Sequence, residues 1–306
     1  MRPRRAPQDI IIRTAIPFYG WLPTPTQFYI RDALVKAKEL QERLFDQSVK
    51  RIESDPDAPR TMLSEMLRLR KSNDKDAAGL TNQEIADELQ TIRGAGHETT
   101  SNTLCWAMLL LARNPHELAR LREESDRVVK GETATYLEAK EMLGHLHAVL
   151  ETLRLYPTVP SFPREAHRDV VLKSSGFDIP AGSFIFVSQR ALNRFGWDRP
   201  DDFVPDRFKD VKNVNMGMPV GNPATGKKYG YVPLGASLRA CTGQRLAILE
   251  AVQALATVTK NVEWTLASDA PIAEVADVTL GPKHGLWFNV RRRIAPSTTP
   301  ELAPAA

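Results

Sequence analysis

Hydrophobic side chains in the first half of the chain recur every three or four positions, which is the period of an α-helix. Between Thr26 and Glu53 this pattern predicts one amphipathic helix, and RTMLSEMLRLRKS predicts a shorter one after a break at SDPDAP. The longest helix is predicted to start at a capping box formed by Thr81 and Glu84 and to stop at the Asn114–Pro115 pair.

More helices follow this long one. Pro115 suits the first position of a helix, and Asn114 is predicted to cap that helix, which ends near Gly131. Thr135 and Glu138 form a second capping box. HLHAVLETLRLYP then predicts a helix ended by its proline. These segments together predict a dense, mostly helical core.

The hydrophobic pattern changes after this proline. DVVLKSSGFDIPAGSFIFVS, residues 169–188, predicts short strands joined by Ser-Gly and Pro-Ala-Gly turns, and VEWTLAS and GLWFNV predict C-terminal strands. One further helix is predicted at QRLAILEAVQALATV. Residues 1–25 are expected to form an irregular lead-in and residues 294–306 a disordered tail. The predicted fold class is mainly α with small β-sheets.

Composition narrows the class of protein. The chain has 306 residues, 42% of them hydrophobic, and its net charge of +4 gives no argument for a nucleic-acid partner. Two cysteines in so long a chain argue against a disulfide-stabilised secreted domain. The longest apolar run, LCWAMLLLA, is far shorter than the roughly 18 residues that span a bilayer, and no signal peptide is visible. We therefore expect no transmembrane segment in this chain.

Cys241 lies in PLGASLRACTG, an irregular segment directly before the last predicted helix. The positive end of a helix dipole favours a thiolate there. Gly235 allows a sharp turn, Gly243 lets the backbone pass close to a flat ligand, and Arg239 can pair with a carboxylate. The spacing of cysteines and histidines does not match a zinc or iron–sulfur site. The loop is equally consistent with the proximal side of a haem and with a buried cysteine in a glycine turn.

The segment GAGHETT, residues 94–100, places Gly94 and Gly96 inside the longest helix, where a glycine costs about 1 kcal/mol relative to alanine. The glycines predict either close packing against the backbone or a local opening of the helix. Glu98 and Thr99 supply a carboxylate and a hydroxyl that can relay protons to a ligand. A helix–helix contact with Glu98 in solvent is the alternative, which the segment alone favours.

Three further charged positions suggest a network. Glu151 and Arg154 stand three apart on one predicted helix face, where a pair is usually a weak surface contact. If Arg207 of PDRF joins them in the interior, the three form a buried network with a structural role. Arg164 is predicted on the turn into the strands. Its sequence context is equally consistent with a cation that binds a cofactor carboxylate and with a solvated turn residue.

The order of these segments along the chain is informative. AGHETT at 95–100, ETLR at 151–154, PDRF at 205–208 and the Cys241 loop follow one another as in the cytochrome P450 superfamily of haem-thiolate monooxygenases, which the chain resembles from about residue 20 to residue 293. ETLRLYP, PREAHRD and AGHETTSNT are similar to the eukaryotic, microsomal type. The resemblance implies the C-terminal, helix-rich haem-binding portion of that fold over residues 26–293.

The resemblance also implies roles for residues. Cys241 would be the axial ligand of haem b (iron protoporphyrin IX), Arg164 and Arg239 would bind the haem propionates, and Gly243 would lie beside the cofactor. The Glu98–Thr99 pair would deliver protons to dioxygen. The three charged residues of the network would form a structural triad. Substrate contacts are expected from residues 93–99, 159–162 and 284–285.

The implied activity is insertion of one oxygen atom from O2 into a small apolar substrate. An NADPH-dependent flavoprotein reductase would supply the electrons at the cytosolic face of the endoplasmic reticulum membrane. Lys227, Lys228 and Arg245 can meet an acidic reductase, and a solvated face is the alternative. One competing interpretation is a catalytically inactive remnant or interaction module. Another is a haem enzyme that catalyses isomerisation or dehydration, but the intact Glu98–Thr99 pair argues against it, because such reactions need no proton relay.

Three departures from the family pattern affect these expectations. Leu234 stands where an aromatic residue is usual and Ser237 where a glycine is usual, and both are interpreted as changes that tune the haem site. The third is the long N-terminal region of the family, which holds the membrane anchor and most strands of the main sheet. We interpret the chain as N-terminally truncated, with an unpaired strand edge at residues 183–188 and a haem open on one side.

Overall fold

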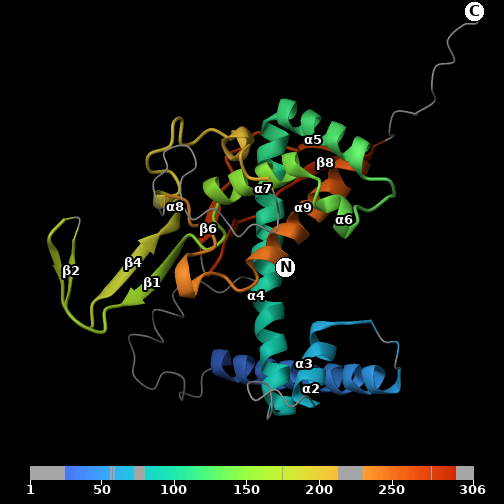
Figure 1. The fold of residues 1–306 in the computed structure, drawn as a ribbon, viewed down its shortest axis with the longest axis vertical. Coiled ribbons are helices and arrows are strands. Elements are labelled where there is room, and N and C mark those ends of the chain that lie inside the picture. Colours follow the sequence, from blue (N-terminus) through green and yellow to red (C-terminus); the bar gives the residue numbers. More distant parts are fainter. Residues whose placement is uncertain are drawn as a thin grey trace, which may run out of the picture. The chain divides into compact units, whose positions relative to one another are not determined.

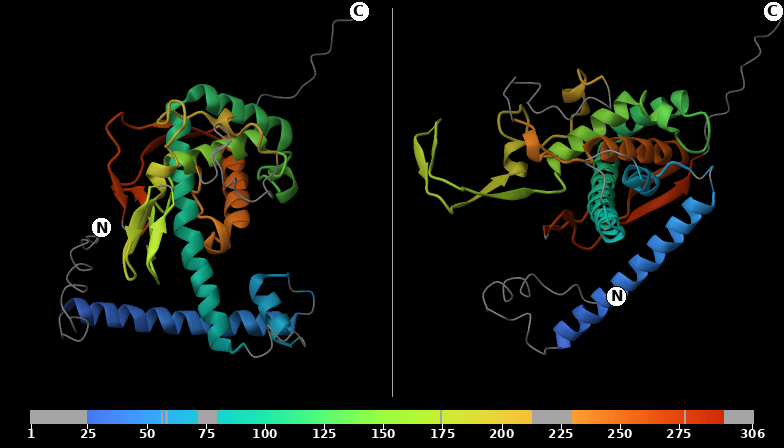
Figure 2. Two further views of the ribbon diagram at one scale, coloured as in Figure 1. Left: turned by 60° about the vertical axis from the view of Figure 1, so that its left-hand side comes forward. Right: turned by 60° about the horizontal axis from the view of Figure 1, so that its bottom comes forward.

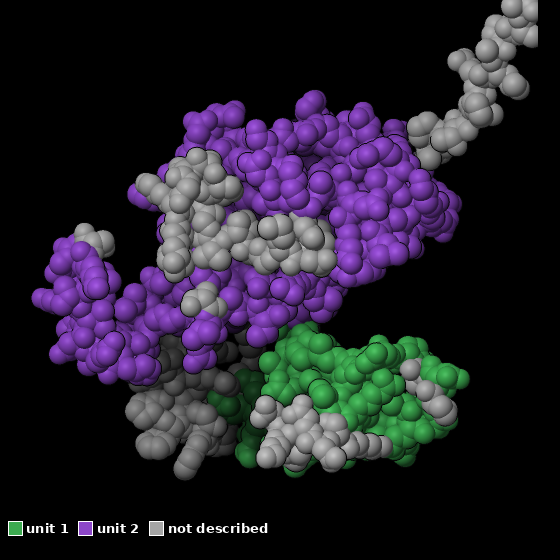
Figure 3. Space-filling model, viewed as in Figure 1, with its two compact units in different colours: residues 1–95 green, residues 96–306 purple. Residues whose placement is uncertain are grey.

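The computed structural model describes residues 25–55, 57, 59–71, 80–173, 175–212, 230–276 and 278–293. The predicted tail and the predicted lead-in, apart from Pro25, lie outside these residues. The chain divides into two compact units, residues 1–95 and 96–306 (Figure 3). The boundary falls within a single long helix, α4 (Asn82–Arg113), so each unit is described by itself.

The first unit is built from helices. It contains α2 (Pro25–Ser54), α3 (Met62–Lys71) and the first turns of α4. These helices enclose a small core formed by Phe45, Leu63, Leu67, Ile85 and Ala86. The capping box predicted at the start of α4 is confirmed: the N–H of Thr81 donates to the Glu84 carboxylate at 2.7 Å, and the N–H of Glu84 donates to the Thr81 hydroxyl at 3.1 Å.

The second unit has a larger helical core. The C-terminal part of α4, α5 (Pro115–Val128), α6 (Tyr136–Ala139), α7 (Leu143–Leu155) and α9 (Gln244–Asn261) enclose it, and Figures 1 and 2 show α5, α7 and α9 side by side. In α7 every side chain from His145 to Leu155 is buried. The mainly helical fold class predicted from the sequence is thereby confirmed.

Both predicted helix starts in this unit are present, but their side chains make different hydrogen bonds. The Thr135–Glu138 capping box is present at the start of α6. Asn114 occupies the capping position of α5 with Pro115 behind it, but its side chain makes no capping hydrogen bond. Its amide instead donates to the carbonyl oxygen of Leu110 in the preceding helix at 2.8 Å. The prediction of Asn114 as the capping residue before Pro115 is therefore confirmed, although its amide satisfies an unpaired carbonyl at the end of α4 and not an N–H of α5.

The strands form antiparallel pairs. The pairs are β1 (Ser161–Glu165) with β4 (Phe184–Ser188), β2 (Val170–Leu172) with β3 (Phe177–Ile179), β5 (Val262–Leu266) with β8 (Phe288–Arg292), and β6 (Glu274–Ala276) with β7 (Leu280–Pro282). The predicted Ser-Gly and Pro-Ala-Gly turns are present, with φ of 69° at Gly176 and 80° at Gly182.

The β1–β4 ribbon projects from the helices of its unit (Figures 1 and 2). Within the described part of the chain, β4 pairs with β1 alone, so its other edge is open, as expected from the sequence. Phe184 and Phe186 on β4 are 70% and 71% exposed. An open edge beside exposed aromatic side chains is a site where another strand can add.

Short elements, namely α8 (Gln189–Leu192), η2 (Pro205–Phe208) and η3 (Ser237–Arg239), connect the remaining parts of the second unit. Among the described helices, none is both long and apolar enough to cross a bilayer.

A buried polar network joins three helices of the second unit. His145 of α7 has no exposed surface, and its Nδ1 lies 2.7 Å from the Glu124 carboxylate of α5. Its Nε2 lies 2.8 Å from the Thr259 hydroxyl of α9 and 3.1 Å from the Ser125 hydroxyl of α5. A neutral imidazole that donates from Nδ1 to Glu124 has one lone pair at Nε2, which accepts from one of the two hydroxyls. The other hydroxyl can donate within the pair, because the Ser125 and Thr259 oxygens lie 2.7 Å apart.

The folded state holds both titratable groups of this network in their deprotonated forms, so it is more stable at neutral pH than in acid. Burial lowers the pKa of His145 below its ordinary 6.5, although Glu124 opposes that effect. Burial raises the pKa of Glu124, but hydrogen bonds from His145 and from the Gly144 N–H outweigh burial, so that this pKa lies below its ordinary 4.5. The unfolded chain therefore binds more protons than the folded chain as the pH falls, first through the histidine and then through the carboxylate.

We expect the free energy of unfolding to fall as the pH is lowered from about 7 to about 5.5, by at most about 1.4 kcal/mol per pH unit from His145. His145→Gln removes the titrating group and should flatten this slope, whatever its effect on absolute stability. The matched control is His116→Gln, because the His116 side chain is 83% exposed. Urea unfolding at several pH values measures the slopes, and an unchanged slope in His145→Gln would contradict the assignment.

Candidate functional site

The Cys241 loop is a compact turn that folds back on itself. Gly235 has φ of 76°, a backbone angle that favours glycine, and a Cβ at this position would lie 3.4 Å from the Ala240 Cα. The N–H of Cys241 donates to the carbonyl oxygen of Leu234 at 2.8 Å and closes the turn. Cys241 itself is exposed, which contradicts the alternative of a buried structural cysteine.

The thiol lies beside the start of α9. Gly243 occupies the capping position of this helix, and a Cβ built there would lie 4.0 Å from the Cys241 sulfur. Leu234 is partly buried against the main core, and Ser237 opens η3. The side chain that replaces the usual aromatic residue therefore attaches the loop to the core of its own unit. The loop presents its sulfur at the positive end of a core helix.

The two candidate propionate ligands lie on different elements. Arg239 ends η3, is exposed, and has no carboxylate partner among the described residues. Arg164 lies on β1, where its guanidinium covers the Phe162 ring at 4.4 Å and donates to the Pro163 carbonyl oxygen at 2.9 Å. Within the described part of the chain, no contact joins Arg164 to Arg239 or to Cys241. An exposed thiol and a free guanidinium two residues away nevertheless suit a group that carries both a metal and carboxylates.

Glu98 and Thr99 lie on an unbroken part of α4. The helix is continuous through Gly94 and Gly96, and a Cβ at either glycine would meet no described atom within 4 Å. The prediction of a local opening is therefore wrong, and no described residue packs against either glycine. Glu98 is exposed and Thr99 is half-buried. The Glu98 carboxylate accepts a hydrogen bond from the Thr279 hydroxyl at 2.8 Å, a partner that the sequence analysis missed.

The structure brings Glu151, Arg154 and Arg207 together. Glu151 and Arg154 have no exposed surface and form a bidentate pair, with Nε–Oε2 at 2.7 Å and Nη2–Oε1 at 2.9 Å. The Nε of Arg207 donates to the same carboxylate at 3.2 Å, and the N–H of Val204 donates to it at 2.9 Å. The weak surface pair considered from the sequence is thus a buried, multiply bonded one.

The two arginines of this network also bind the backbone of the irregular segment of residues 197–204, called the meander below. Arg154 donates to the carbonyl oxygens of Pro200 at 2.6 Å and Asp202 at 2.9 Å. Arg207 donates to the carbonyl oxygen of Arg199 at 2.7 Å. Each charged group of this network therefore has hydrogen-bond partners, which is the condition for a buried ion network to be tolerated.

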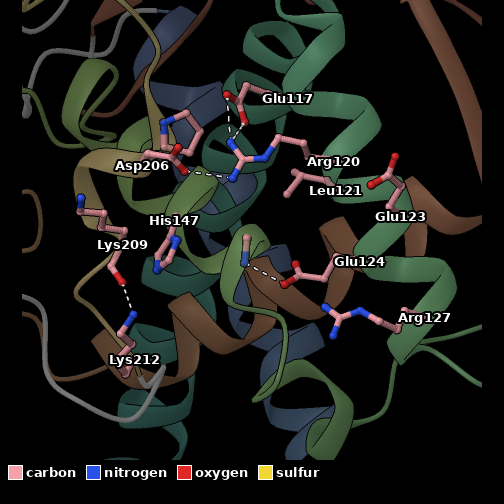
Figure 4. A pocket seen from close by; sticks show the side chains of 12 residues that line it. Glu117, Arg120, Leu121, Glu123, Glu124, Arg127, His147, Asp206, Lys209 and Lys212 are labelled. Atoms are coloured by element: carbon pink, nitrogen blue, oxygen red, sulfur yellow. Dashed lines mark hydrogen bonds and ion pairs between the residues drawn. The ribbon is translucent and has the colours of Figure 1, made fainter.

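A cavity of about 560 Å³ lies between α5, α7 and η2 (Figure 4). Arg120 crosses it, 3.0 Å from the Glu117 carboxylate and 3.0 Å from the Asp206 carboxylate. Its other walls carry charged side chains of both signs, and none of the predicted site residues lines it. A lining of this kind does not suit an apolar substrate.

A thiol presented at the amino end of a core helix, beside a meander clamped by buried arginines, is the arrangement expected of a haem protein with a cysteine ligand. The chain belongs to the cytochrome P450 family, whose family model matches residues 11–287. The order of the segments recognised in the sequence is thus explained by common ancestry.

The similarity to several curated proteins covers most of this chain. Cytochrome P450 97B2, chloroplastic, of Glycine max is 29% identical over 91% of the chain and 53% of that protein. Carotene epsilon-monooxygenase, chloroplastic, of Arabidopsis thaliana is 27% identical over 86% of the chain and 46% of that protein. Cytochrome P450 4d1 of Drosophila simulans is 30% identical over 88% of the chain and 51% of that protein. The chain spans about half the length of these relatives.

Proposed function

We propose that the protein is a haem-thiolate monooxygenase, or the C-terminal part of one, with haem b held by Cys241. The observation that carries the proposal is the exposed thiol in a turn fixed to the start of α9. Arg239, and Arg164 if it is freed from its local contacts, would bind the propionates, and Gly243 leaves room beside the sulfur. When bound, the haem supplies activation of dioxygen by two electrons from an NADPH-dependent flavoprotein reductase.

In the overall reaction, one oxygen atom enters a C–H bond of an apolar substrate and the other leaves as water, which consumes two electrons and two protons. The side chains proposed to move these protons are Glu98 and Thr99. Glu98 is exposed and can exchange protons with solvent, while Thr99 is half-buried on the adjacent position of α4. Residues 159–162 and 284–285 are proposed to contact the substrate with residues 93–99.

The apolar substrate class has support from one matched relative, which carries the name carotene epsilon-monooxygenase. For the reductase contact we propose the exposed face around Arg245, whereas Lys227 and Lys228 lie outside the described residues. We propose the membrane of the endoplasmic reticulum as the location. The chloroplastic names of two relatives make a plastid membrane the alternative.

Haem titration of the purified full chain tests the proposal. We expect one haem per chain and, after reduction under carbon monoxide, the long-wavelength absorption band that thiolate ligation produces. Circular dichroism on the same sample reports whether the helices are formed. A helical protein that takes up no haem would overturn the proposal in favour of an inactive remnant or interaction module.

A further inference from the structure

One face of α4 contacts residues 279–281, at the start of β7. Glu98, Asn102 and Trp106 follow one another at intervals of four residues, so their side chains point to the same side of the helix. Each of them contacts a residue of the segment 279–281 or its backbone. The contact therefore extends over two helical turns and belongs entirely to the second unit.

Thr279 makes the first of these contacts. Its hydroxyl donates to Oε1 of Glu98 at 2.8 Å and accepts from the side-chain amide of Asn102 at 3.3 Å. Thr279 is 9% exposed. Because the Asn102 amide donates to this oxygen, the hydroxyl proton is directed at the carboxylate. Within the described residues Oε2 of Glu98 has no hydrogen-bond partner, whereas Oε1 is bonded to Thr279.

The next residues fix Thr279 in place. The indole N–H of Trp106 donates to the carbonyl oxygen of Leu280 at 3.0 Å, and the N–H of Leu280 donates to the Thr158 carbonyl oxygen at 2.8 Å. Leu280 is 2% exposed. A Cβ at Gly281 would lie 3.2 Å from Oδ1 of Asn102, so the strand approaches the helix closely. Thr279 is thus held by the backbone on one side and by Asn102 on the other.

We propose that Thr279 is a positioning residue that selects one rotamer of Glu98 and leaves Oε2 of that carboxylate as the proton-carrying atom. An exposed glutamate on a helix otherwise samples several side-chain rotamers. The bond also ties Glu98 to the hairpin of β6 and β7, next to the 284–285 turn proposed to contact the substrate. The inference rests on the proposed function, because it assigns Glu98 a proton-carrying task.

The test compares Thr279→Val, which removes the hydroxyl at nearly constant volume, with Thr279→Ser, which keeps it. Thr265→Val on the exposed side of β5 is the matched control. In the haem-free chain, NMR should show displaced side-chain signals for Glu98 and Asn102 in Thr279→Val only. In the haem-loaded enzyme with its reductase, Thr279→Val should lower the product formed per NADPH by about tenfold, with hydrogen peroxide in its place.

The two readouts separate the possible failures. Unmoved NMR signals, or displaced signals with unchanged product yield, would overturn the positioning role. Restoration by serine of both the signals and the yield would support it. A wild-type enzyme that oxidises no substrate would instead remove the proposed function, and the NMR signals alone would then decide whether Thr279 orients Glu98.

Discussion

Cys241→Ala is expected to abolish the long-wavelength band of the reduced carbonyl complex completely. Alanine has no metal-binding atom, and the turn around Cys241 offers no second sulfur. The other cysteine, Cys105, is half-buried in α4, where burial raises the pKa of its thiol above the ordinary 9.0 and favours the form that does not bind metal. Cys105→Ala is therefore the matched control and should keep the band.

The stability of the variant makes this result interpretable. Cys241 is exposed, so its replacement should change the free energy of unfolding by no more than about 0.5 kcal/mol. Its N–H bond to Leu234 involves only backbone and survives the substitution. Loss of the band in a chain with unchanged urea midpoint would identify the ligand. Persistence of the band in Cys241→Ala, or its loss in Cys105→Ala, would refute the assignment.

Arg154→Met is expected to lower the free energy of unfolding by about 3–5 kcal/mol. The substitution removes the bidentate partner of a fully buried carboxylate and leaves the carbonyl oxygens of Pro200 and Asp202 without their donor. Domains of ordinary size are stable by about 5–15 kcal/mol, so the loss is a large part of the total. Urea unfolding measures it directly.

Arg120→Met provides the matched control for this prediction. Arg120 also bridges a helix to η2, through Glu117 and Asp206, but its side chain is 46% exposed. Exposed pairs contribute about 1 kcal/mol or less, so this variant should unfold close to the wild-type midpoint. Where Arg154→Met does not fold, Arg154→Lys keeps the charge and loses the fork geometry, and it should retain only part of the stability. Equal losses in Arg120→Met and Arg154→Lys would contradict the role of burial.

The features predicted correctly from the sequence depend on residues close together in the chain. The Thr81–Glu84 and Thr135–Glu138 boxes depend on bonds between positions three apart, and both were predicted correctly. The spacing of Glu151 and Arg154 gave their pairing but not their burial, because burial depends on the whole unit that surrounds α7.

The features that were missed depend on distant partners. Thr279 lies 181 positions from Glu98, and no local pattern links a threonine before a short strand to a glutamate on a long helix. Gly94 and Gly96 suggested a special backbone, yet α4 is regular there, since helix formation by the neighbouring residues outweighs the low propensity of two glycines. The exposure of Cys241 could not be predicted from the sequence either, because a turn that contains glycines can hold either a buried or an exposed cysteine.

The arginine clamp on the meander acts through main-chain atoms. Arg154 and Arg207 bind the carbonyl oxygens of residues 199, 200 and 202, and Glu151 binds the N–H of Val204. These hydrogen bonds depend on the course of the backbone and not on most of the side chains in this segment. Substitutions at solvent-facing positions of the meander should therefore alter its surface chemistry, and with it the partners it can bind, while the three buried charges keep its backbone in place.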